Sequence, residues 1–148
     1  MNRQDAMRRA FRAPTHVAVK VTPEGFEIVD ERVAELCGRV RQVTLVRKLF
    51  EDNFLACSSP DGVRGTDGKL CDECRHPMCQ PRLRLRLATD TVLYLLELNA
   101  TSARNYFRLE DQATAAKTHI ARWPLRLSVV SHGYWGEVCF ERLNEPTP

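Results

Sequence analysis

The chain has 148 residues, of which 43% are hydrophobic and 28% are charged, and this is the composition of an ordinary globular domain. Its formal net charge of +3 is too small to indicate a nucleic-acid partner by itself. The longest apolar run, VLYLL at residues 92–96, is far shorter than the roughly 20 residues of a membrane span, and the N-terminus lacks the apolar stretch of a signal peptide. We therefore expect a soluble, cytoplasmic protein without a membrane partner.

The first fifty residues predict a short arm followed by strands. Residues 1–14 are basic and predict a flexible arm. In HVAVKVT, residues 16–22, apolar and polar positions alternate, which is typical of a half-buried strand with Lys20 on its polar face. The apolar positions between residues 29 and 40 follow helical spacing, although a strand fits them as well. Residues 41–50 are rich in β-branched side chains and predict a further strand.

The second half of the chain predicts two hairpins. Residues 82–87 and 91–98 are strand-forming segments joined by a short turn, so they predict the first hairpin. Residues 124–130 and 134–143 predict a second one around a Gly-containing turn. Residues 144–148 form a polar tail.

One helix is predicted between these hairpins. Thr101 or Ser102 can cap its start, and its apolar face consists of Tyr106, Leu109, Ala113, Ala116 and Ile120. Short antiparallel strands with one late helix predict a β-rich α+β fold. We expect a single domain over residues 15–143, built as a small antiparallel barrel of the oligonucleotide-binding (OB) type. An open α+β sheet fits the same order of elements.

A cluster of cysteines surrounds a turn-rich segment. Residues 57–71 contain three Gly, one Pro and two Asp-Gly pairs, so the segment has almost nothing to bury. The cluster has the spacing C-x13-C-x2-C-x4-C and consists of Cys57, Cys71, Cys74 and Cys79. Four thiolates can hold a zinc ion tetrahedrally, and metal binding would supply the folding energy that the segment lacks. The sequence therefore predicts a zinc-binding insertion at residues 57–80 with structural Zn²⁺.

Other interpretations of the cysteines remain open. His76 lies inside the cluster and could replace one of the four ligands. Four cysteines also hold iron–sulfur clusters, and Cys71 with Cys74 could form a redox-active pair. Cys37 and Cys139 have apolar neighbours and are predicted to be buried thiols.

The segment RLRLRL, residues 82–87, places side chains of two kinds on opposite faces of a strand. Its core face would carry Leu83, Leu85 and Leu87. Its other face would carry a row of cations, spaced by roughly 6.5–7 Å, that consists of Arg82, Arg84 and Arg86. Three adjacent like charges favour an anionic partner such as a nucleic-acid backbone. The alternative is that the arginines pair with glutamates of neighbouring strands, namely Glu97, Glu137 or Glu141.

Three further residues extend the predicted nucleic-acid site. Lys20 and Arg126 occupy the polar faces of their strands. Trp135 alternates with Glu137, which predicts a polar-face tryptophan that could stack on bases, whereas Tyr134 is predicted to point inward.

The cysteine cluster and the basic strand together carry a family resemblance. An OB barrel with a cysteine-rich zinc insertion resembles the phage single-stranded-DNA-binding proteins that have a zinc subdomain. The resemblance implies single-stranded DNA binding and an origin in a phage or mobile element. The chain departs from that family in using four cysteines rather than a mixed His/Cys set, and in lacking a long acidic tail.

We therefore expect a non-catalytic protein that binds single-stranded nucleic acid, with single-stranded DNA favoured. The alternative is a zinc-stapled protein–protein interaction module or accessory subunit, whose zinc loop contacts a partner. An enzyme is the third hypothesis, and it depends on His76 leaving an open metal position. The chain contains no P-loop, GxGxxG or HExxH motif. We accordingly predict that it is not an enzyme.

Overall fold

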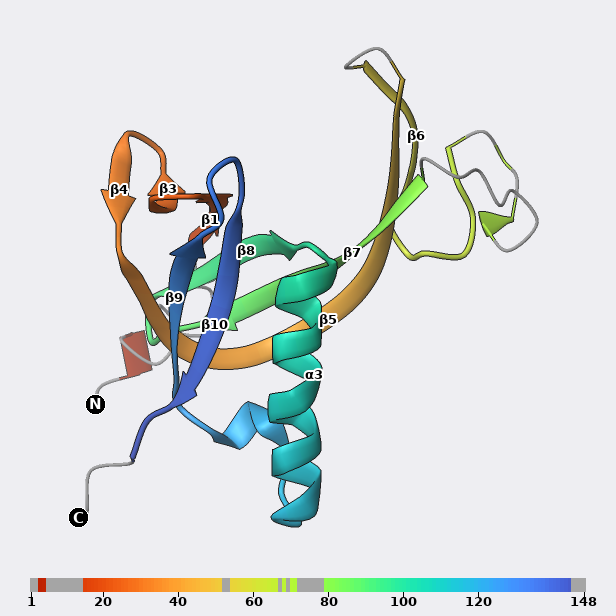
Figure 1. Cartoon of the computed structure of the whole chain (residues 1–148). Coiled ribbons are helices and arrows are strands. Elements are labelled where there is room, and N and C mark those ends of the chain that lie inside the picture. The colour runs from red at the N-terminus through yellow and green to blue at the C-terminus, as the bar shows by residue number, and fades with distance from the viewer. Residues whose placement is uncertain are drawn as a thin grey trace.

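The computed structural model describes residues 3–4, 15–51, 54–66, 68, 70–71 and 79–144 (Figure 1). Almost all of the predicted basic arm and the predicted tail lie outside these residues. The described elements are ten strands, the helix α3 (Ala100–Ala115) and the short 3₁₀ helix η1 (Ile120–Arg122). The strands are β1 (Thr15–Ala18), β2 (Lys20–Thr22), β3 (Gly25–Ile28), β4 (Glu31–Val33), β5 (Glu35–Glu51), β6 (Phe54–Ser59), β7 (Cys79–Ala88), β8 (Val92–Leu98), β9 (Leu125–Ser131) and β10 (Gly136–Arg142). The predicted β-rich fold with one late helix is confirmed.

Seven strands form a mixed sheet with the order β1-β8-β7-β5-β9-β10, in which β6 also pairs with β5. Strand β1 runs parallel to β8, whereas the other neighbours in this sheet are antiparallel. The long strand β5 connects the parts of the sheet, because it pairs with β9 near its start and with β6 near its end. A second, three-stranded sheet has the order β2-β3-β4.

The sheet of the described residues is not a closed barrel, so the predicted OB-type closure is wrong. Strands β1 and β10 lie at the two ends of the sheet order and do not pair with each other. Helix α3 explains the open edge at β10. The Ser102 hydroxyl accepts a hydrogen bond from the Val138 amide at 2.9 Å, and the Asn105 amide donates to the Val138 carbonyl at 3.0 Å. Helix side chains thus satisfy backbone groups that would otherwise be available to another strand.

The core lies between the sheet and α3. Leu85 and Leu87 of β7 are fully buried, and so is Leu98 of β8. The helix contributes Tyr106, Leu109 and Ala113, as its apolar spacing predicts. Within the described ranges, no helix has both the length and the apolar character needed to cross a membrane.

The ends of α3 differ in detail from the prediction. Asn99 is the N-cap residue, and its side chain accepts a hydrogen bond from the Ser102 amide at 3.0 Å. Ala116 is the exposed C-cap residue, and Ile120 is buried from η1 rather than from α3. The residues at both ends are therefore placed by capping and by the following turn, which apolar spacing does not encode.

Both predicted hairpins are confirmed, by the β7–β8 and β9–β10 pairings. Residues 29–40 belong to a turn and to strands β4 and β5. The strand alternative for this segment is therefore confirmed, and the helical interpretation is wrong. Cys37 is exposed and Cys139 is only half-buried, which corrects the prediction of two buried thiols. The reason is strand alternation: the neighbouring residue Leu36 takes the buried face.

Candidate nucleic-acid interface

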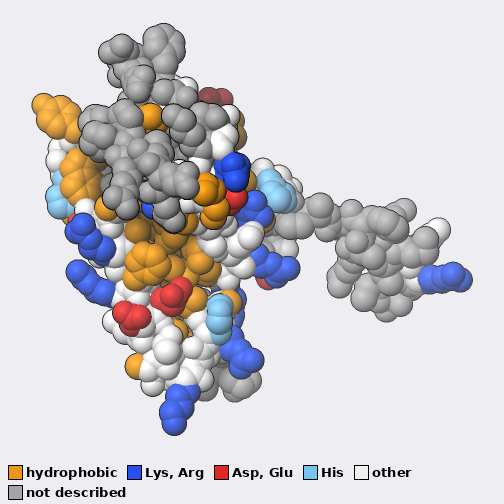
Figure 2. Space-filling view, turned by 90° about the vertical axis from the view of Figure 1, so that its right-hand side faces the viewer, with side chains coloured by type: hydrophobic (Ala, Val, Ile, Leu, Met, Phe, Trp, Pro, Cys, Tyr) orange, Lys and Arg blue, Asp and Glu red, His pale blue; other side chains and the backbone are white. Residues whose placement is uncertain are grey.

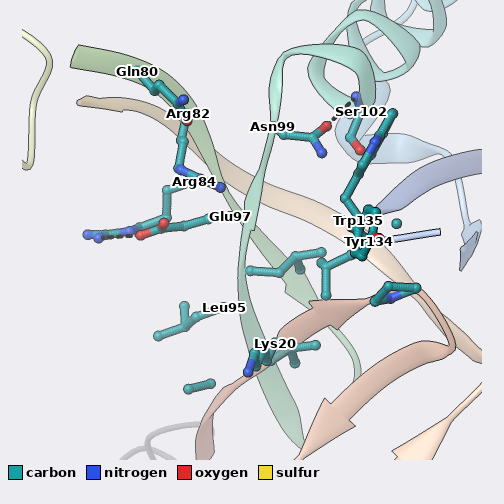
Figure 3. Close-up of a pocket in the computed structure, with 16 residues that line it drawn as sticks. Lys20, Gln80, Arg82, Arg84, Leu95, Glu97, Asn99, Ser102, Tyr134 and Trp135 are labelled. Carbon is teal, nitrogen blue, oxygen red and sulfur yellow. Dashed lines mark hydrogen bonds and ion pairs between the residues drawn. The ribbon is translucent and has the colours of Figure 1, made fainter. Parts of the chain in front are cut away.

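A groove of about 890 Å³ lies over the outer face of β7 and β8 (Figure 3). Its walls come from distant parts of the chain. Strand β1 runs alongside β8. The Val19 amide, directly after β1, donates a hydrogen bond to the Leu95 carbonyl at 2.8 Å, and beyond it the backbone turns away from β8. Strand β2 and the β9–β10 turn complete the groove, whose polar and aromatic lining includes Lys20, Arg82, Arg84, Glu97, Tyr134 and Trp135. Four of the six predicted contact residues thus line one groove.

The predicted two-sided character of β7 is confirmed, but its three arginines have different surroundings. Arg82 has no hydrogen bond or ion pair to any of the described residues. The Arg84 guanidinium lies 3.1 Å from Glu97 Oε1, and that of Arg86 donates to Gln42 Oε1 at 3.0 Å. Arg86 does not line the groove. The alternative interpretation, pairing with neighbouring glutamates, therefore holds for Arg84, while Arg82 is available to a ligand.

Glu97 is held between two cations. Lys48 Nζ lies 2.8 Å from its carboxylate, and Arg84 Nη2 lies 3.1 Å away. Burial acts to raise the pKa of Glu97, but the hydrogen bonds and charges of Lys48 and Arg84 outweigh it, so the pKa lies below its ordinary value. Among the described residues, the charged lining of the groove consists of Lys20, Arg82, Arg84 and this carboxylate, which together carry a formal charge of +2 at neutral pH.

This ion pairing predicts a loss of stability in acid. The ionised Glu97 stabilises the folded protein fully above its ordinary pKa of 4.5, and this contribution is lost as pH falls through the lower pKa of the folded state. We expect the urea midpoint to fall with pH in this range, and Glu97→Gln to reduce that fall. Glu141→Gln, at an exposed carboxylate outside the groove, is the control and should keep the wild-type pH dependence. An identical pH dependence in Glu97→Gln and wild type would contradict this assignment.

Trp135 is fixed by a chain of contacts. The residue is 39% exposed, and its ring stacks on His132 with a centroid distance of 4.3 Å and an angle of 14° between the planes. His132 Nε2 lies 2.8 Å from Glu137 Oε1, and the Asn105 amide donates to Glu137 Oε2 at 2.8 Å. The hydrogen bonds from Asn105 and then from His132 lower the pKa of Glu137. Glu137 therefore orients the imidazole that supports Trp135.

Tyr134 is fully exposed and lines the groove, so its predicted inward orientation is wrong. Residues 132–135 form the β9–β10 turn, and the strand alternation begins only at Gly136. In Figure 3, Tyr134 and Trp135 lie on one side of β8, and Arg82 and Arg84 lie on the other. The groove therefore has an aromatic side and a cationic side.

Arg126 lies outside the groove. Its guanidinium is 3.5 Å from both Glu35 and Glu141, on the neighbouring strands β5 and β10. Its charge is thus balanced within the sheet, where it supports strand pairing. Basic side chains on the face shown in Figure 2 are scattered and are not gathered into one patch.

The cysteine cluster is described only in part. Cys74 and His76 lie outside the described residues. Cys57 and Cys79 both pair with Leu49, from the two strands that flank β5, so their side chains share one face of the sheet. The Cys71 amide donates to the Val63 carbonyl at 2.7 Å, which folds this segment back on itself. The described residues alone contain no group of three or more potential metal ligands, and zinc binding stays a prediction.

The groove is also lined by residues that the sequence did not single out for the site, among them Gln80, Asn99 and Tyr134. Gln80 could have been found by extending the alternation of Arg82 and Arg84 by one step. Asn99 carried a helix N-cap signal directly before the apolar stripe. The position of Tyr134 depends on where the β9–β10 turn ends, which the sequence pattern does not define.

The fold and the site thus define a β-rich α+β protein with a groove that is cationic on one side and aromatic on the other. No protein-family model matches the chain, and it has no match among curated proteins or solved structures. Any functional assignment therefore depends on the chemistry of the groove itself.

Proposed function

We propose that this protein binds single-stranded nucleic acid, preferably DNA, in the groove over β7 and β8. The observation that carries the proposal is that Lys20, Arg82 and Arg84 line the same groove as Trp135. Cationic side chains hold the phosphate backbone, and an exposed tryptophan stacks on a base. These are the two components of single-strand recognition that does not depend on sequence. The activity is binding, without a chemical step.

A single strand suits this arrangement better than a duplex. Stacking on Trp135 requires an unpaired base, because the face of a base is covered within a double helix. Arg82 is available on the opposite side for a phosphate. A strand that passes between the two sides could therefore make both contacts at once.

The salt dependence of binding tests this proposal. Each phosphate contact to a single strand contributes about 0.7 to the slope of log K against log salt concentration. We expect Arg82→Gln to reduce this slope by about 0.7, measured by fluorescence anisotropy with a labelled oligo-dT. Arg86→Gln is the matched control, because it removes the same charge from the same strand outside the groove. A wild-type slope in Arg82→Gln, or the same loss in both variants, would argue against the groove as the binding site.

We also propose that the cysteine cluster holds structural zinc. The pairing of Cys57 and Cys79 with the same residue, Leu49, brings two soft thiol ligands to one face of the sheet. Cys71 and Cys74 would complete a four-thiolate set. Zinc bound there would stabilise the turn-rich segment that joins β6 to β7.

Metal analysis of the purified protein tests the zinc proposal. We expect about one zinc ion per chain, and its loss in Cys71→Ser, because a closed structural site uses four ligands. Cys139→Ser removes a thiol on β10, outside the cluster, and should retain the metal. A metal-free wild-type protein, or equal zinc content in Cys71→Ser, would contradict the proposal.

A second candidate function is a protein-interaction module. Strands β5 and β6 extend away from the body of the molecule (Figure 1), and apolar side chains are exposed there and in the following segment. They are Leu45, Leu55 and Val63. A protein partner could cover this surface. Failure of the protein to bind any oligonucleotide at low salt would favour this function over the first.

A further inference from the structure

A second hollow of about 290 Å³ adjoins the groove between the start of β7 and the start of α3. Gln80, Pro81 and Arg82 form one side, and Asn99 and Trp135 contribute to the rest. Four of these five residues also line the larger groove, so the two spaces lie next to each other. A strand in the groove could thus place one base in the hollow.

The polar groups of the hollow have hydrogen-bonding capacity to spare. Neither Gln80 nor Arg82 has a side-chain hydrogen bond to the described residues. Asn99 uses its carbonyl oxygen to accept from the Ser102 amide at 3.0 Å. Its amide group keeps its donors. Gln80 therefore offers both a donor and an acceptor, whereas Arg82 and Asn99 offer donors.

Trp135 supplies a stacking surface that is oriented before any ligand arrives. One face of the indole is covered by His132, at a centroid distance of 4.3 Å. The Glu137 carboxylate holds this imidazole at 2.8 Å, and Asn105 holds the carboxylate. A ring fixed in this way loses little conformational freedom when a base stacks on it.

We propose that this hollow is a base pocket that binds one purine of the bound strand. The inference rests on the proposed function and adds a base preference to it. A glutamine side chain pairs with N6 and N7 of adenine, and an arginine pairs with O6 and N7 of guanine. Gln80 and Arg82 provide these two partners. Cytosine and thymine lack N7, so neither base presents the paired groups that these two side chains recognise on a purine.

The experiment compares short oligo-dT strands that carry a single dA, dG, dC or dT at the central position. Binding is measured by competition in fluorescence anisotropy at one salt concentration. We expect the strands with a central dA or dG to bind at least fivefold more tightly than those with dC or dT, in line with one specific base contact. We expect Gln80→Ala to abolish the advantage of the dA strand over the dT strand, because the side chain that pairs with N6 and N7 of adenine is removed. Gln80 is exposed, so its replacement does not disturb the core.

A matched control and the pattern of outcomes separate this inference from the proposed function. Gln42→Ala removes the same side chain from β5, outside both hollows, and should keep the purine preference. Equal affinity for all four strands would overturn the purine pocket while the proposed function stands. A dA advantage that survives in Gln80→Ala would also overturn it. Absence of binding to every strand would overturn both.

Discussion

Replacing Leu85 with alanine is expected to lower the free energy of unfolding by about 2–5 kcal/mol. Leu85 lies at the centre of β7, paired with Val43 on β5 and with Leu96 on β8, and none of its surface is exposed. Truncation removes buried methyl groups and leaves a cavity that the tightly paired strands cannot close. Urea denaturation followed by circular dichroism measures the change.

The control for this prediction is the same substitution at an exposed site. Leu55 lies on β6 and is 52% exposed, so Leu55→Ala should lower the free energy of unfolding by less than about 1 kcal/mol. The slope of the free energy of unfolding against urea concentration should stay the same in both variants if unfolding remains two-state. Similar losses at the two positions would contradict a core centred between β7 and α3.

Replacing Trp135 with alanine is expected to weaken binding to single-stranded DNA by roughly 5- to 150-fold. This range corresponds to about 1–3 kcal/mol for one base stacked on an aromatic side chain. Trp135 contributes to both the groove and the adjoining hollow, so its loss affects the strand at the point where the two meet. Equilibrium anisotropy with labelled oligo-dT measures the change, and Trp135→Phe should recover part of the affinity.

An exposed aromatic residue elsewhere provides the control. Phe107 on α3 is 47% exposed and lies outside both hollows, with its ring 5.6 Å from that of Tyr106. Phe107→Ala should therefore leave the affinity for oligo-dT within about twofold. Unchanged binding in Trp135→Ala would show that no base stacks on this residue. An equal loss of affinity in both variants would indicate a general effect on folding.

Local sequence patterns predicted much of the cationic side of the groove. The alternation in RLRLRL correctly separated buried Leu83, Leu85 and Leu87 from the three arginines, because the side chains of a strand alternate between its faces. Lys20 and Trp135 were also predicted from alternation, although Trp135 belongs to a turn. The helix stripe around Tyr106 followed the helical period in the same way.

Contacts between distant segments could not be predicted in this way. Arg84 on β7 pairs with Glu97 on the adjacent strand β8, and Arg126 lies between Glu35 and Glu141. All of these side chains nevertheless occupy polar strand positions. Alternation predicts the face of a strand on which a side chain lies. It does not predict which charges of neighbouring strands will meet. The groove residues therefore could not be separated from Arg86 and Arg126 by sequence.

The sequence by itself determined the two late hairpins, the apolar face of α3 and the two-sided character of β7, since these depend on residues a few positions apart. The tertiary structure alone decided that the sheet stays open, that β1 runs parallel to β8, and that Trp135 lies across β8 from Arg82. The physical reason is that these features depend on competition between distant partners for the same edges and charges. At β10 the side chains of Ser102 and Asn105 bind the backbone groups that a further strand would need, and the sheet ends there.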